Sequence, residues 1–294
     1  MTAKLSPFLI VLAAMLWGTT GTAQAFAPET AHPVAVGAAR LAVGGLFLVA
    51  IVLTTGNFSF ENWPVKSTIL ASLSMALYQP LFFSAVSLTG VAIGTVIAIG
   101  SAPVLSGFME WIFLRKRPVA VWWYSTLLSI SGCFLLFLNK DSVTADPVGI
   151  LLALGAGLSF AGYTIVSRDL VERHSSLSVA AVVFTLSAIC LSPFLFVFDM
   201  NWIATLNGMG VSLHLGIMAT GIAYFLFVKG LLHVPSSTAV TLALAEPLTA
   251  ALLGVFLVGE YLSSSSWVGI GLLMLGIGLL IWSSKNEEHP GSNV

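Results

Sequence analysis

Charged residues are scarce in this sequence. Only 8% of its 294 residues are Asp, Glu, Lys or Arg, whereas a soluble domain carries about a quarter. The deficit extends along the whole chain, in which 57% of the residues are hydrophobic and the mean hydropathy is +1.00. These values exclude a soluble domain held by one membrane anchor. They predict an all-α integral membrane protein that crosses the bilayer many times.

Cysteine and the motifs of enzymes are also missing. The two cysteines, Cys133 and Cys190, lie inside apolar runs, which argues against a disulfide framework. No basic stripe indicates a nucleic-acid partner. No phosphate-binding loop, metal-ligand spacing or nucleophile motif is present, so we expect neither catalysis nor a cofactor or metal. Any transport by this chain therefore uses a gradient of substrate or ions.

Ten apolar segments are separated by short connections, and a short polar tail follows the last one. An apolar helix of about 20 residues crosses a bilayer. We interpret the first segment as a transmembrane helix, although Lys4 and Ala23-Gln24-Ala25 resemble a signal peptide with its cleavage site, because the apolar run continues to Ala27. The segments cover 6–26, 33–54, 66–88, 91–114, 119–138, 147–167, 177–198, 210–232, 235–258 and 264–284.

The basic residues predict the orientation. With the N-terminus in the cytoplasm, only Lys140 falls in an outer connection and Arg40 lies within the second helix. Basic residues collect in cytoplasmic loops, so this split predicts a multi-pass protein of the inner (plasma) membrane with both termini cytoplasmic. The nine basic residues on the cytoplasmic side are Lys4, Lys66, Arg115, Lys116, Arg117, Arg168, Arg173, Lys229 and Lys285.

An internal repeat relates the two halves of the chain. Pro103 and Pro247 are 144 residues apart (247 − 103), and the same offset pairs other glycines and tryptophans. Five helices fit in that interval, so the second half is predicted to lie upside down relative to the first, as in secondary transporters. We therefore expect two inverted five-helix repeats, residues 1–143 and 144–294. The further pairs are Gly18 with Gly162, Trp123 with Trp267, and Gly132 with Gly276.

Several motifs carry a resemblance to a known family. They are Leu16-Trp17-Gly18 in the first helix, Ala102-Pro103-Val104 and Glu246-Pro247-Leu248 in the fourth helix of each half, Val258-Gly259-Glu260 at the end of the ninth, and Gly132 and Gly276 in the helices that follow. With this spacing the chain resembles the EamA-type exporters of the drug/metabolite transporter superfamily. One departure is Arg115-Lys116-Arg117, where the family usually keeps Gly-Glu.

The resemblance implies a function. It implies an inner-membrane secondary transporter that exports small metabolites by alternating access, with a site at the midplane between the repeats. Overall similarity is greatest to bacterial exporters of aromatic amino acids, so amino acids, and aromatic ones first, are the expected substrates. Alternatives are a drug or other metabolite carrier of the same fold, or a channel-like or non-transporting membrane protein. The expected partners are the small-molecule substrate and the bilayer, and a monomer is compatible with this reading.

Glu246 is the sharpest single candidate for function. It is the one ionisable residue in the segment 235–258, near mid-membrane, where an acid is expected to face protein or water rather than lipid. It could couple transport to protons or contact a substrate ammonium, or it could be a buried structural acid. Arg40, about two turns into the second helix, is a possible counter-ion. Glu110 is instead predicted to pair locally with Arg115 or Lys116.

The candidate substrate-binding residues come from several helices. In the third helix Tyr78-Gln79-Pro80 places polar groups beside a proline, which kinks a helix and frees carbonyl groups. The alternative is a kink that serves packing alone, and glycines such as Gly18 also let helices approach closely. The predicted set consists of Trp17, Gly18, Thr20, Tyr78, Gln79, Pro80, Ser101, Tyr163 and Tyr224.

Overall fold

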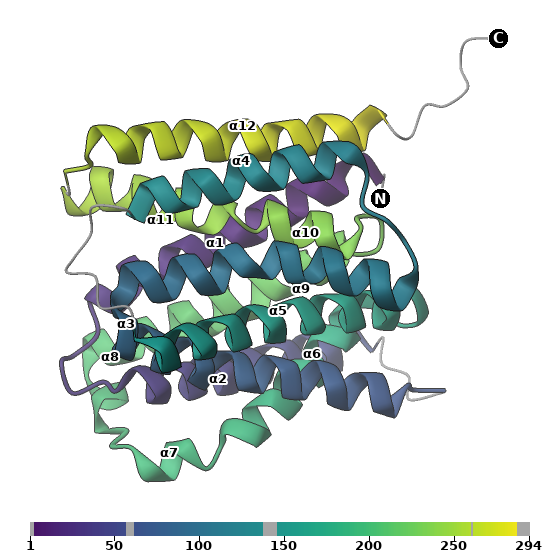
Figure 1. Cartoon of the computed structure of the whole chain (residues 1–294). Coiled ribbons are helices and arrows are strands. Elements are labelled where there is room, and N and C mark those ends of the chain that lie inside the picture. Colours follow the sequence, from purple (N-terminus) through teal and green to yellow (C-terminus); the bar gives the residue numbers. More distant parts are fainter. Residues whose placement is uncertain (1–2, 57–61, 138–145, 260, 287–294) are drawn as a thin grey trace.

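The computed structural model describes residues 3–56, 62–137, 146–259 and 261–286, and these residues contain no β-strand. Lys140, Glu260 and the polar tail after Asn286 lie outside them. The α-helices of Figure 1 are α1 (Ser6–Ala25), α2 (Pro33–Thr55), α3 (Val65–Leu114), α4 (Ala120–Phe137), α5 (Pro147–Arg173), α6 (Ser176–Leu191), α7 (Phe194–Val197), α8 (Leu206–Leu213), α9 (Ala223–Gly230), α10 (Ser236–Leu242), α11 (Ala245–Leu253) and α12 (Ser264–Asn286). Two π-helices, η3 (His214–Ile222) and η4 (Gly254–Val258), and two 3-10 helices, η1 (Ala3–Leu5) and η2 (Asn201–Ala204), complete the order.

Nine helices within the described residues are long and apolar enough to cross a membrane. The long helix α3 supplies two of them, Val65–Gly90 and Ile93–Leu114, which meet at Gly90 with a non-helical backbone (φ 82°, ψ 162°). The connection expected between the segments 66–88 and 91–114 is therefore present.

The seventh predicted segment is shorter than expected. Instead of covering 177–198, α6 ends at Leu191 after 16 residues, and the short α7 follows. Pro193 explains the break, because proline offers no N–H and its ring crowds the carbonyl group four residues earlier. The described residues thus give nine helices of spanning length and one shorter apolar helix, rather than ten of full length.

Local capping explains several helix starts. Asp146 precedes α5, and its carboxylate accepts hydrogen bonds from the backbone N–H groups of Val148 and Gly149 at 2.8 and 2.9 Å. Ser175 caps α6 in the same way through the N–H of Ser178. Such side chains satisfy the N–H groups that a helix leaves unpaired at its first turn. The polar connections thus define where the spans begin.

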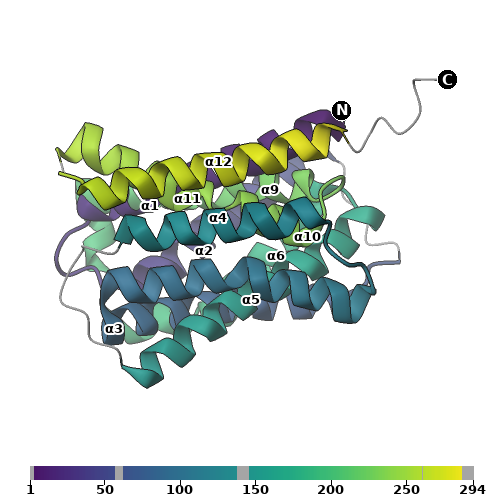
Figure 2. The same cartoon turned by 45° about the horizontal axis from the view of Figure 1, so that its top comes forward.

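The helices form a bundle in which segments distant in sequence pack together. Figures 1 and 2 show α4 beside α12 along one edge, and α3 beside α5. α2 packs on α6, and α1 runs through the middle against α9 and α11. α1 begins and α12 ends at the same end of the bundle in both views. We call this the basic end, because Lys116, Arg117 and Arg168 line a crevice there together with Ser284 near the end of α12.

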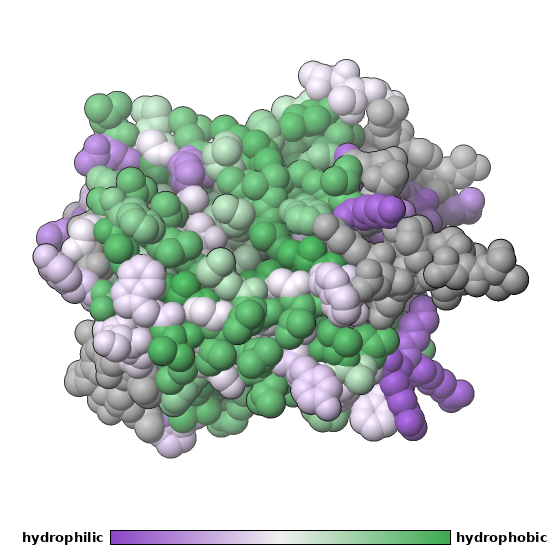
Figure 3. Space-filling model, turned by 90° about the horizontal axis from the view of Figure 1, so that it is seen from above, coloured by the Kyte–Doolittle hydropathy of each residue, from purple (hydrophilic) through white to green (hydrophobic). Residues whose placement is uncertain are grey.

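Apolar side chains cover the outside of the bundle. In the view of Figure 3 a broad hydrophobic surface lies between hydrophilic residues gathered toward the two ends. Large hydrophobic side chains on many spans are more than half exposed, which a soluble monomer does not tolerate over such an area. Examples are Leu46, Leu53, Leu127, Leu151, Phe256 and Leu275. This surface matches the hydrocarbon core of a bilayer.

Candidate functional site

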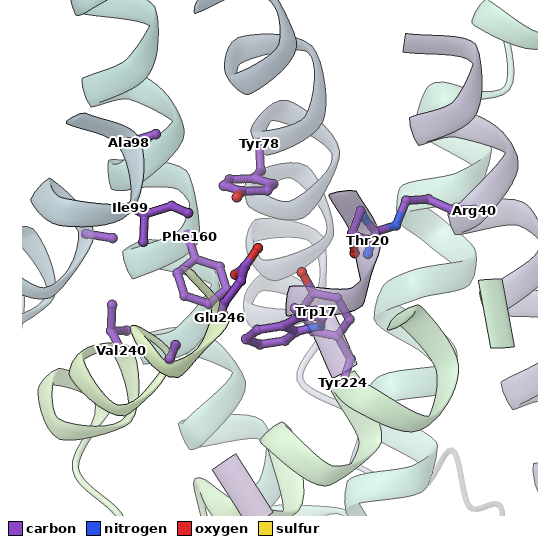
Figure 4. Close-up of a pocket in the computed structure, with 12 residues that line it drawn as sticks. Trp17, Thr20, Arg40, Tyr78, Ala98, Ile99, Phe160, Tyr224, Val240 and Glu246 are labelled. Atoms are coloured by element: carbon purple, nitrogen blue, oxygen red, sulfur yellow. The ribbon is translucent and has the colours of Figure 1, made fainter. Parts of the chain in front are cut away.

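A cavity lies in the centre of the bundle and contains two opposite charges. It has about 40 Å³ of space that water can reach, and its walls come from seven helical elements. Figure 4 shows Arg40 and Glu246 on different sides of it, with Tyr78 above and Trp17 and Tyr224 below. The lining residues are Trp17, Thr20, Arg40, Tyr78, Ala98, Ile99, Ala102, Phe160, Tyr224, Val240, Ala243 and Glu246.

Arg40 is fixed by a π-helix. Its Nε donates to the hydroxyl of Thr220 at 3.1 Å, and its Nη2 donates to the carbonyl oxygen of Ala219 at 3.1 Å. Both acceptors belong to η3, and π-helical turns loosen the regular pattern of backbone bonds, frequently at functional sites. Arg40 is only 7% exposed, so these hydrogen bonds offset part of the cost of burying its charge.

Glu246 is placed by a break between two helices. Pro247 follows it directly, and the chain changes from α10 to α11 across Ala243 and Leu244. Proline is tolerated in the first turn of a helix, where N–H groups have no helical partner. Glu246 consequently lies in the first turn of α11, where the helix dipole favours a carboxylate.

Arg40 and Glu246 are not joined directly. Within the described part of the chain, no ion pair links the two side chains, although both line the same cavity. The direct counter-ion that we considered for Glu246 is thus absent from this arrangement. Both charged side chains face the same water-accessible space.

Aromatic rings form much of the remaining wall. The ring of Trp17 lies 4.6 Å from that of Tyr224 and 5.8 Å from that of Phe160. Tyr78 lies 5.9 Å from Phe160 across the cavity. Behind this layer Phe227 packs on Trp17 at 5.1 Å. The cavity therefore combines a charged pair with flat apolar surfaces.

Five of the predicted site residues do not line the cavity. Gly18 faces α11, where an added Cβ atom would lie 2.6 Å from the Cβ of Thr249 and 2.7 Å from the carbonyl oxygen of Glu246. The Ser101 hydroxyl donates to Ala98 O, at 3.3 Å. The remaining three, which are Gln79, Pro80 and Tyr163, lie outside the lining, Gln79 and Tyr163 being buried. The structure brings together Trp17, Thr20, Arg40, Tyr78, Tyr224 and Glu246.

Half of the lining was missed by sequence reasoning. These residues are apolar, and none was predicted as a site residue, although Ala102 belongs to the motif Ala102-Pro103-Val104. They are Ala98, Ile99, Ala102, Phe160, Val240 and Ala243. The 144-residue offset, applied to Glu246, points to Ala102 (246 − 144), and applied to Ala243 it points to Ile99 (243 − 144). Both pairs line the cavity, so the repeat contained information about its walls.

The prediction for Glu110 was wrong. Its carboxylate does not pair with Arg115 or Lys116; it accepts a hydrogen bond from Nη1 of Arg168 on α5 at 3.2 Å. It also accepts from the backbone N–H and the hydroxyl of Ser237 on α10. Arg115 ends α3 in a left-handed conformation (φ 53°) and turns the chain away from the carboxylate.

Comparisons with known proteins agree with this architecture. The sequence profile of the EamA-like transporter family matches residues 4–138 and 147–282. The uncharacterized transporter YwfM of Bacillus subtilis is 52% identical over 98% of this chain and 97% of that protein. The threonine/homoserine exporter RhtA of Escherichia coli is 28% identical over 91% of this chain and 88% of its own length. A crystal structure of a protein 20% identical in sequence superposes with a TM-score of 0.83, over 98% of this chain and 99% of that one.

The apolar exterior, the spanning helices and these matches define a multi-pass membrane transporter, not an enzyme. The chain belongs to the EamA-like transporter family.

Proposed function

We propose that the protein is a carrier of the inner membrane that exports small zwitterionic metabolites, amino acids first. The observation that carries this proposal is the presence of Arg40 and Glu246 in one central cavity without a direct bond between them. A guanidinium group suits a carboxylate, and a carboxylate suits an ammonium group. An α-amino acid presents both groups on one carbon atom.

The cavity is small, and its size indicates how transport proceeds. A water molecule needs about 10–15 Å³ of such space, so 40 Å³ holds a few waters and not a whole amino acid. The walls must separate to admit a substrate. This requirement fits alternating access, in which two halves of a carrier move against each other around a site at the midplane.

In the proposed mechanism the two moving parts are two inverted five-helix halves, residues 1–143 and 144–294. The double match of the family profile supports this division. So do the cavity pairs Ile99 with Ala243 and Ala102 with Glu246, which obey the repeat offset. The short helix α6 serves as the tenth span, and the shared end of α1 and α12 supports an even number of crossings. The basic end faces the cytoplasm in this proposal.

The substrate side chain has two supported candidates. The aromatic wall of Trp17, Tyr78 and Phe160 suits a flat ring and supports the preference for aromatic amino acids. The name of the relative RhtA supports threonine and homoserine instead. Both classes share the ammonium and carboxylate groups that the charged pair recognises, so the proposal for the site does not depend on this choice.

Flux into liposomes tests the proposal. Purified protein is reconstituted, and uptake of tryptophan, phenylalanine, threonine and homoserine is measured with and without a pH gradient. We expect saturable flux of at least one of them. Glu246→Gln and Arg40→Gln are each expected to reduce it about tenfold or more, the loss of a hydrogen bond to a charged group. Glu172→Gln, on the surface beside Arg168, is the matched control and keeps full flux.

The results separate the alternatives. No flux of any amino acid above empty vesicles contradicts the substrate class and favours a drug or other metabolite carrier. Conductance that does not saturate indicates a channel. Flux that responds to the pH gradient in the parent protein but not in Glu246→Gln assigns proton coupling to that carboxylate. Flux that is unaffected by the pH gradient and by Glu246→Gln indicates that Glu246 is a structural acid.

A further inference from the structure

A second buried carboxylate, outside the central cavity, joins the two predicted halves at the basic end. Glu110 lies near the end of α3 and is 3% exposed. Its Oε1 accepts from Nη1 of Arg168 on α5 at 3.2 Å, and its Oε2 accepts from the N–H of Ser237 on α10 at 3.1 Å and from the Ser237 hydroxyl at 2.5 Å. The first half thus contacts two separate elements of the second half through one side chain.

These bonds form a unit that is stable only in this arrangement. A buried carboxylate is costly unless its oxygens are paired, and here both oxygens have donors. Hydrogen bonds to a charged group are about twice as strong as neutral ones. Separation of α3 from α5 and α10 removes all three donors together. The contact therefore has a closed state, with all three hydrogen bonds, and an open state without them.

The contacts of Glu110 with Arg168 and Ser237 lie between a crevice and the central cavity. The crevice, at the basic end, has about 300 Å³ of space and is lined by Glu110, Lys116, Arg168 and Ser237 among others. Val240, which lines the central cavity, lies three residues after Ser237 and so on the same face of α10. Only about one helical turn, roughly 5 Å, separates the two spaces along this helix.

A further polar contact lies on α10 at the level of the central cavity. Thr241 on α10 and Thr126 on α4 share a hydrogen bond of 3.0 Å, and both side chains are buried. The crevice and the cavity are arranged in series along α10, with the contact between Ser237 and Glu110 on the crevice side and the threonine pair at the level of the cavity.

We propose that Glu110 is the gate residue for the basic end, and that release of Arg168 and Ser237 opens a path from the central cavity through the crevice. The inference rests on the proposed carrier function, which supplies the need for a path that opens at alternate ends. Glu110 lines the crevice but not the central cavity, and it acts by holding α5 and α10 in position.

Accessibility of a single cysteine tests the gate without any substrate. Val240→Cys is placed in a background from which Cys133 and Cys190 have been removed. Membrane vesicles of both orientations are treated with a membrane-impermeant thiol reagent. In the Glu110→Gln variant we expect labelling from the basic end to become about tenfold faster, the size of one lost charge-assisted hydrogen bond. Labelling from the opposite end is expected to slow.

Two further variants serve as a control and as a second test of the gate. Glu172→Gln removes the other carboxylate beside Arg168, 3.8 Å away and on the surface, and it is expected to leave labelling unchanged. Ser237→Ala removes one donor and is expected to give a smaller increase from the basic end. If Glu110→Gln does not fold, Ser237→Ala decides the question, because alanine is tolerated at a buried serine position more readily.

The possible outcomes distinguish this inference from the proposed function. Equal labelling rates in the parent, Glu110→Gln and Ser237→Ala overturn the gate, even if amino-acid flux is normal. An equal increase in Glu172→Gln also overturns it, because that variant leaves the bridge between halves intact. An absence of amino-acid flux in the parent protein contradicts the substrate class, while the labelling rates still decide the gate.

Discussion

Arg40 is the residue on which the positive side of the central cavity depends. Its guanidinium group donates two fixed hydrogen bonds to η3, from Nε to Thr220 and from Nη2 to Ala219 O. A lysine ammonium is a point charge and cannot keep this planar fork while it also contacts a ligand. We expect Arg40→Lys to raise the half-saturating amino-acid concentration about tenfold, which corresponds to the loss of one hydrogen bond to a charged group. The measurement is concentration-dependent uptake in liposomes.

The control for Arg40→Lys is Arg173→Lys. Arg173 makes a surface pair with Asp169 at 2.9 Å, and its side chain is 62% exposed. Such pairs contribute little, about 0–1 kcal/mol. Equal half-saturation in the parent and in Arg40→Lys argues that the guanidinium group has a structural role only.

Gly18 determines how closely α1 approaches α11. A Cβ atom there meets Thr249 and the backbone of Glu246 at 2.6 and 2.7 Å, so Gly18→Ala must push the helices apart. Overpacking of this kind costs about 1–3 kcal/mol. We expect a lower melting temperature for Gly18→Ala in detergent. Gly21→Ala is the matched control, because nothing lies within 4 Å of a Cβ atom at Gly21; an equal loss in both variants contradicts the argument.

The charged residues of the cavity, its tryptophan and its two tyrosines were predictable from the sequence, whereas Phe160 and the aliphatic members were not. Glu246 and Arg40 stand out because charges are expensive at mid-membrane. Ala98 and Val240 resemble every other apolar residue of the chain, and only three-dimensional packing selects them. Gly18 is the opposite case: it was predicted as a site residue because it follows Trp17, but in the structure it lets α1 pack closely on α11.

At the scale of the element, Gly90 allows two spans to follow each other without a loop. Its φ of 82° and ψ of 162° are accessible almost only to glycine. A side chain at this position costs about 1–3 kcal/mol of strain. We expect Gly90→Ala to lower the melting temperature, measured by loss of monodisperse protein on heating. Gly278→Ala in α12, with no neighbour within 4 Å, is expected to have little effect; a comparable loss there speaks against strain at Gly90.

Element boundaries were predictable where a turn residue is decisive and not where packing or pairing decides. α5 continues to Arg173, beyond the predicted end at 167, because Arg168 with Glu172 and Asp169 with Arg173 form pairs one turn apart. α6 ends early, at Leu191, because Pro193 follows, and the continuous apolar pattern gave no sign of this end. The partners of Glu110 come from distant elements, so its local sequence suggested the wrong ones.

At the scale of the whole molecule, the proposed inversion of the halves requires alternate connections to lie on opposite sides of the membrane. Lys116 follows the fourth predicted span, at the basic end, and Leu206 begins the span after α7, at the other end. Both are exposed, Leu206 at 85%. In a background without Cys133 and Cys190, we expect Leu206→Cys to react with a membrane-impermeant thiol reagent in intact cells. Lys116→Cys is expected to react only after the membrane is opened.

The physical reason lies in the distribution of charge. Moving Lys116 and its two arginine neighbours across the membrane opposes the cytoplasmic preference of basic loops, whereas the connection before Leu206 carries one acid and no base between 199 and 205. Lys229→Cys, near the end of α9, extends the test, because the proposed arrangement returns this site to the side of Lys116. Reaction of Lys116→Cys and Leu206→Cys from the same side contradicts ten spans in two opposed halves, and with them the alternation of access around the Arg40 and Glu246 cavity.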